Sequence, residues 1–223
     1  MPSRRSFFTS SVGSKYLIAF SGLALVGFLV GHLAGNLLIY VSPDAFNHYG
    51  EAMIHNPLLI PAELGLLALF LLHAYKAARL FLGATKARPV GYARKEWAGY
   101  TSRKSWASTT MILTGTFLLV FVPLHLKTFK YGPHYVAPDG GRDLWRLMVE
   151  VFSRPGYVVF YSIGMAIVGF HLWHGVSSAF QSLGTDRTSL SARIRVVGWI
   201  LAVIVGGGFF TIPLYVYFLG ARS

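Results

Sequence analysis

The chain has 223 residues, of which 54% are hydrophobic and 13% are charged, and it carries a net charge of +12 at pH 7. Soluble domains have about 25% charged residues, so this composition indicates a membrane protein. The chain has no cysteine, which excludes disulfides, thiolate zinc sites, cysteine-ligated iron–sulfur clusters and covalent c-type haem attachment.

Five apolar runs follow one another along the chain, and each is long enough for a transmembrane helix, which needs about 20 apolar residues. Pro43 follows the first run, Pro57 and Pro61 open the second, and Pro155 precedes the fourth. We therefore expect an all-α integral membrane protein with one membrane domain over residues 1–223. Its transmembrane helices are predicted at residues 16–41, 58–82, 106–126, 156–181 and 196–219.

Basic residues are distributed unevenly between the two sides of the membrane. If the N-terminus lies inside, the inner segments hold 14 basic and two acidic residues, and the outer segments hold six of each. The positive-inside rule then predicts a cytoplasmic N-terminus and, after five spans, an outer C-terminus. The basic inner face is explained by topology and lipid headgroups, or by docking of a soluble partner. Nothing in the sequence indicates nucleic-acid binding.

Four of the five apolar runs contain histidine, and an ionisable residue inside a membrane helix is costly enough to suggest a function. At about 1.5 Å rise per residue, His32 and His125 lie outward of the helix middles and His73 and His171 lie inward. The outer pair matches in height only to about 5–9 Å. Two pairs at two depths predict two bis-histidine b-type haems in a four-helix bundle.

Other uses of these histidines remain open, because a lone histidine commonly hydrogen-bonds between helices and a series of them can form a proton path. Zinc is disfavoured, since no carboxylate or cysteine joins either level. His171 and His174 share a helix face, so we expect only one of them to ligate a given haem iron. Height favours His171, which leaves His174 as a neighbour near a propionate or a quinone.

Further polar residues flank the predicted haem sites. Lys76 and Arg79 lie inward of His73, where they would contact haem propionates or snorkel to lipid headgroups. His48, Glu51 and Glu63 lie on the outer side, as solvated loop residues or as groups that exchange protons with a quinone.

Glycines recur in two of the predicted helices. Gly27, Gly31 and Gly35 are spaced by four in the first, and Gly206–Gly208 interrupt the fifth. This pattern indicates close helix packing or room for a flat cofactor beside His32, and the two readings are compatible.

The ordered set of motifs resembles the cytochrome b membrane-anchor subunit of succinate dehydrogenase or fumarate reductase, in its five-helix, two-haem, single-subunit form. No tripeptide is specific alone, but the set covers nearly the whole chain. The matching pieces are Gly31-His32-Leu33, Leu72-His73-Ala74-Tyr75, Leu124-His125-Leu126 and Phe170-His171-Leu172-Trp173-His174-Gly175, with residues 8–15, 44–49, 87–92 and 178–184.

The resemblance implies that His32 and His125 ligate the haem far from the catalytic subunits, and that His73 and His171 ligate the near one. His174 occupies a position that is not generally a ligand in that family. The fumarate-reducing branch also has a glutamate proposed to transfer quinol protons near the outer haem, for which Glu51 and Glu63 are the nearby candidates here.

The expected function is electron transfer in the bacterial cytoplasmic membrane. By resemblance, a separate flavoprotein oxidises succinate, an iron–sulfur subunit passes on the electrons, and this chain carries them across two haems to a quinone, expected to be menaquinone. The chain has no flavin or nucleotide motif, so we expect no dicarboxylate chemistry from it alone. The alternatives are a di-haem cytochrome b of a hydrogenase or formate dehydrogenase, and a haem-free transporter or proton channel.

Overall fold

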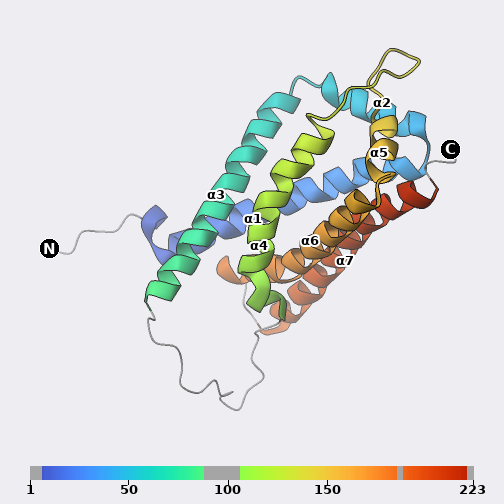
Figure 1. Ribbon diagram of the computed structural model, residues 1–223. Helices are drawn as coiled ribbons and strands as arrows, with labels where there is room; N and C mark the ends of the chain where they lie inside the picture. The colour runs from blue at the N-terminus through green and yellow to red at the C-terminus, as the bar shows by residue number, and fades with distance from the viewer. Residues whose placement is uncertain (1–6, 88–105, 185–187, 220–223) are drawn as a thin grey trace.

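A computed structural model describes residues 7–87, 106–184 and 188–219 of the chain (Figure 1). Residues 88–92 of the sequence motif at 87–92 lie outside the described residues, as do several charges used for the topology prediction. These charges are Arg4, Arg5, Arg88, Arg94, Lys95, Glu96, Arg103, Lys104, Asp186, Arg187 and Arg222.

Helices make up almost all of the described structure, and within these residues it has no β-strand, only an isolated bridge between Val136 and Arg142. Five helical segments are long and apolar enough to cross a membrane, which confirms the all-α membrane fold. The helices are α1 (Ser11–Asn36), α2 (Pro43–Ile54), α3 (Leu59–Lys86), α4 (Trp106–Phe129), α5 (Leu144–Phe152), α6 (Pro155–Ser182) and α7 (Thr188–Phe218), with short 3-10 helices at Phe7–Thr9 and Leu37–Tyr40.

Helix α1 begins five residues before the predicted start. Ser10 caps it, because its Oγ accepts a hydrogen bond from the backbone N–H of Gly13 at 3.0 Å and donates one to the Phe7 carbonyl at 2.7 Å. Such a cap satisfies an N–H group that has no partner within the helix. At the other end, the 3-10 turn Leu37–Tyr40 extends the span to residue 40.

Two short helices, α2 and α5, form where loops were predicted. Ser42 caps α2 with Pro43 in its first turn, and Asp143 caps α5 by accepting from the Arg146 N–H. These are recognisable helix start signals. Together with the turn 130–143, they form a cap that lies where α7 ends (Figure 1). We call it the outer cap, after the predicted topology.

The most extensive packing joins α6 and α7. A Cβ on Gly206 would lie 2.8 Å from the Cα of Gly169, so the two backbones touch. Similarly, a Cβ on Gly35 would meet the Tyr49 ring at 2.3 Å. The packing prediction is therefore confirmed for Gly35 and Gly206, whereas a Cβ on Gly27 or Gly31 would meet nothing within 4 Å.

Candidate functional site: two facing histidine pairs

The outer pair consists of His32 on α1 and His125 on α4, with ring centres 6.0 Å apart and ring planes at 81°. Aromatic rings enclose both imidazoles. Phe28 stacks on His32 at 5.3 Å, and Phe121 stacks on His125 at 5.9 Å. Tyr161 of α6 lies 6.1 Å from His125. The outer pair thus sits in an apolar, largely aromatic environment.

The inner pair consists of His73 on α3 and His171 on α6, with ring centres 6.4 Å apart and ring planes at 68°. The inner pair lies about 16 Å from the outer pair along α1, since His73 contacts Ser21 and His32 follows Ser21 by eleven positions at 1.5 Å each. The structure therefore brings together the same pairs of residues that the helix heights suggest.

The helix ends also remove the height mismatch of the outer pair. The spans that contain the pair run over Ser11–Tyr40 and Thr110–Phe129. At 1.5 Å per residue, His32 then lies about 10 Å and His125 about 8 Å outward of the middle of its span. The mismatch therefore came from the predicted boundaries.

Both inner histidines make hydrogen-bond contacts through Nδ1. The Nδ1 of His73 lies 3.1 Å from the Ile18 carbonyl oxygen and 3.2 Å from the Ser21 Oγ. The Nδ1 of His171 lies 3.0 Å from the Thr114 Oγ1. A carbonyl oxygen can only accept, so His73 carries its proton on Nδ1 and keeps an unprotonated Nε2. Metal-ligating histidines typically have this arrangement.

The outer histidines are held differently. The Nδ1 of His125 is buried without a hydrogen-bond partner. The Asn36 amide nitrogen donates to the His32 carbonyl at 2.8 Å and lies 3.3 Å from the His32 Nδ1. Because that amide nitrogen is a donor, a His32 that ligates through Nε2, with its proton on Nδ1, requires the Asn36 side chain to turn. The outer pair is therefore less preorganised than the inner pair.

The spacing of both pairs fits a haem iron. An iron atom held between two imidazole nitrogens, with metal–nitrogen bonds of about 2.0 Å, places the ring centres about 6.3 Å apart. The described residues contain no group of three or more histidine and acidic side chains that would hold a metal ion unaided. A porphyrin supplies four nitrogens of its own, so two axial histidines per iron suffice.

The remaining residues predicted near the inner site differ in their burial and in their partners. His174 is half-buried one turn beyond His171. Lys76 is 8% exposed and donates from Nζ to the Phe8 carbonyl at 2.8 Å. Arg79 is exposed, and its guanidinium lies 3.5 Å from the Tyr75 hydroxyl. Lys76 thus ties down the N-terminal turn, and its role toward a propionate stays a prediction.

In the outer cap, Glu51 accepts hydrogen bonds from the Arg142 backbone N–H at 3.1 Å and from His55 Nε2 at 2.8 Å. These bonds, with the Arg142 bond as the larger cause, hold the pKa of the Glu51 carboxyl below its usual value. Glu63 forms an ion pair with Lys130, and His48 is exposed. Glu51 therefore joins two parts of the outer cap, and Glu63 joins α3 to that cap. Their proton-transfer role remains a prediction.

Sequence reasoning missed the polar residues that contact the histidines, namely Ser21, Asn36 and Thr114. A signal for two of them was present. Ser21 precedes His32 by eleven residues, and Thr114 precedes His125 by eleven residues. Eleven residues make three helical turns with about 20° to spare, so hydroxyl and histidine share one helix face.

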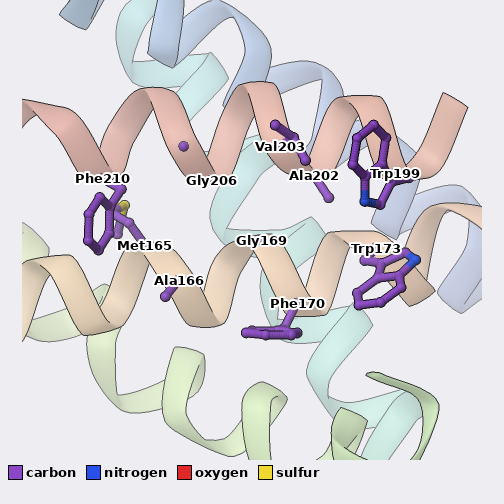
Figure 2. Close-up of a pocket in the computed structure, with 11 residues that line it drawn as sticks. Met165, Ala166, Gly169, Phe170, Trp173, Trp199, Ala202, Val203, Gly206 and Phe210 are labelled. Carbon is purple, nitrogen blue, oxygen red and sulfur yellow. The ribbon is translucent and has the colours of Figure 1, made fainter. Parts of the chain in front are cut away.

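An apolar groove of about 220 Å³ lies between α6 and α7, away from the histidines. Figure 2 shows Trp173 and Trp199 at one end of this groove and Met165 and Phe210 at the other. By helical position, His171 is on the opposite face of α6. The groove is therefore separate from the histidine pairs.

Comparison with known proteins gives no further guide to this site: no family model, no curated protein and no solved structure matches the chain.

Proposed function

We propose that this chain is a di-haem cytochrome b that carries electrons through a membrane. The proposal rests on two pairs of facing histidines. The ring centres of His32 and His125 lie 6.0 Å apart, and those of His73 and His171 lie 6.4 Å apart. Each of the four comes from a different membrane-spanning helix. Four histidines with unrelated structural roles would not be expected to face one another in two pairs at this spacing.

The residues of the chain have defined tasks in this function. His73 and His171 would hold one iron through Nε2, and His32 and His125 would hold the other. Phe28 and Phe121 stack on the outer histidines and would restrict the orientation of their rings. Bound between such ligands, a haem supplies one-electron transfer at a potential set by its ligands and their burial.

The resemblance to the anchor subunit of succinate dehydrogenase and fumarate reductase supports a more specific proposal. The chain passes electrons between an iron–sulfur subunit, itself served by a flavoprotein, and a membrane quinone, which we take to be menaquinone. The chain lies in the bacterial cytoplasmic membrane with its N-terminus inside. The excess of basic residues in the inner segments suits docking of soluble subunits.

Purification of the full chain from haem-sufficient cells tests the proposal. We expect two haems per chain with a low-spin bis-histidine absorption spectrum. Absence of haem from the folded protein would overturn the proposal in favour of a haem-free transporter or proton channel.

A di-haem cytochrome b of a hydrogenase or formate dehydrogenase would share both histidine pairs. Co-purification separates this alternative from the anchor subunit. Recovery of a flavoprotein and an iron–sulfur subunit with succinate- or fumarate-linked activity supports the anchor, whereas recovery of a hydrogenase or formate dehydrogenase subunit would replace it.

A further inference from the structure

Each inner histidine contacts a hydroxyl on a neighbouring helix. The Ser21 Oγ of α1 lies 3.2 Å from the His73 Nδ1, and the Thr114 Oγ1 of α4 lies 3.0 Å from the His171 Nδ1. The two contacts are equivalent in kind, because in both a hydroxyl from a helix that carries an outer histidine reaches an inner one.

The direction of these hydrogen bonds follows from the single proton of each hydroxyl. The Ser21 hydroxyl donates to the Leu17 carbonyl at 2.6 Å. The Thr114 hydroxyl lies 3.1 Å from the Met111 carbonyl and 3.2 Å from the Thr110 carbonyl, either of which takes its proton. With the hydroxyl protons in these bonds, each oxygen is an acceptor toward its histidine, and both imidazoles donate from Nδ1 and keep the Nε2 lone pair free.

The positions of Ser21 and Thr114 along their helices also support these hydrogen bonds to the inner histidines. Ser21 is fully buried on α1, and its hydroxyl has the same eleven-residue offset from His32 as Thr114 has from His125. Helices α1 and α4 thus each supply one ligand to the outer pair and one acceptor to the inner pair. Within the described residues, the outer pair has no matching arrangement, since Nδ1 of His125 lacks a partner and Nδ1 of His32 faces a donor.

The geometry points to Ser21 and Thr114 as positioning residues that set the reduction potential of the inner haem. Thr114 fixes the tautomer of His171, and Ser21 shares the Nδ1 proton of His73 with the Ile18 carbonyl. This inference rests on the proposed function. A hydrogen bond from Nδ1 makes an imidazole more basic, and a more basic ligand favours ferric over ferrous iron. Loss of an acceptor therefore raises the potential of the inner haem.

Thr114→Val is the primary test, because it keeps the branched shape and removes the hydroxyl. In a redox titration of the full haem-loaded chain, we expect one haem to titrate at a more positive potential. The ratio of reduced to oxidised haem at a fixed potential should change about fivefold, as for the loss of one hydrogen bond. The second haem should be unchanged, and Thr114→Ser should restore the wild-type titration.

Thr116→Val is the matched control. Its hydroxyl makes the same kind of bond, to the Ile112 carbonyl at 2.8 Å, but on an exposed face of α4. Both haems should titrate as in the wild type. If Thr114→Val retains two haems and titrates as this control does, the inference is wrong while the proposed function stands.

A second measurement does not depend on haem. Nitrogen-15 NMR of labelled histidines in the full chain prepared without haem reports which ring nitrogen is protonated. We expect His73 and His171 as Nδ1–H tautomers, with His171 losing that preference in Thr114→Val. Nε2–H tautomers at both would overturn the inference even if Thr114→Val fails to assemble with haem. A wild-type chain that binds no haem would instead overturn the proposed function.

Discussion

His73 and His171 face each other at 6.4 Å, although their helices pack mainly against other neighbours. Helix α3 packs against α1, and α6 packs against α7, α4 and α1. Helix α1, which packs against both α3 and α6, therefore places the two rings opposite each other, and Ser21 and Thr114 contact them there. Two rings that face each other without extensive packing between their own helices are suited to hold a group between them.

Removal of a single histidine should identify which residues share a haem. We expect His73→Ala and His171→Ala to lose the same spectral component, and His32→Ala and His125→Ala to lose the other. Each variant should retain one haem per chain, measured as a pyridine haemochrome against protein concentration. Loss of different components within a pair would contradict the pairing.

His174→Ala is the companion test, since His174 lies one turn from His171 and half-buried. Two haems should remain in this variant. If it loses the inner haem while His171→Ala keeps it, the assignment of the ligand is reversed.

The sequence predicted the five spans and both histidine pairs because length, apolarity and height along a helix depend directly on residue number. It did not predict α2 and α5, whose contacts depend on the tertiary fold. Asn47 of α2 donates to the Asp143 carboxylate at 3.0 Å and accepts from the Trp145 N–H at 2.9 Å, nearly a hundred residues away. The hydroxyl contacts were missed because they depend on how each helix is rotated about its axis.

Gly206→Ala tests the contact between α6 and α7. The new Cβ would lie 2.8 Å from the Gly169 Cα and 3.3 Å from the Met165 carbonyl oxygen, so the backbones must separate. Overpacking of this kind costs about 1–3 kcal/mol, which thermal unfolding in detergent should detect as a lower Tm. Gly207→Ala is the control, because its Cβ meets nothing within 4 Å. A Tm for Gly206→Ala at or above that of the control would contradict the packing.

Lys76→Met distinguishes a structural from a haem-binding role of the buried lysine. Its Nζ donates to the Phe8 carbonyl, and a hydrogen bond from a charged group is worth about 1.5–3 kcal/mol. We expect amide exchange near the Phe7–Thr9 turn to rise about tenfold or more, with both haems retained. Arg79→Met, which changes an exposed residue, should leave exchange unaltered. A loss or spectral shift of the inner haem in Lys76→Met would instead support a propionate contact.

Glu51 should make the outer cap sensitive to acid. The Arg142 N–H, followed by His55, lowers the pKa of its carboxyl in the folded chain. A carboxyl whose pKa is lowered in the folded chain stabilises the fold fully at pH values above its unfolded pKa of about 4.3. That stabilisation is lost as the pH falls through the folded pKa. Protection of the Arg142 amide in hydrogen exchange, corrected for the intrinsic pH dependence, should therefore fall below about pH 4.

Glu51→Gln should reduce that protection at neutral pH and remove most of its acid dependence, since the neutral side chain does not titrate. His55→Ala keeps the Arg142 hydrogen bond to Glu51, the larger cause of the shift, so it should keep most of the acid dependence. An acid response in Glu51→Gln as large as in the wild type would show that another group controls this turn.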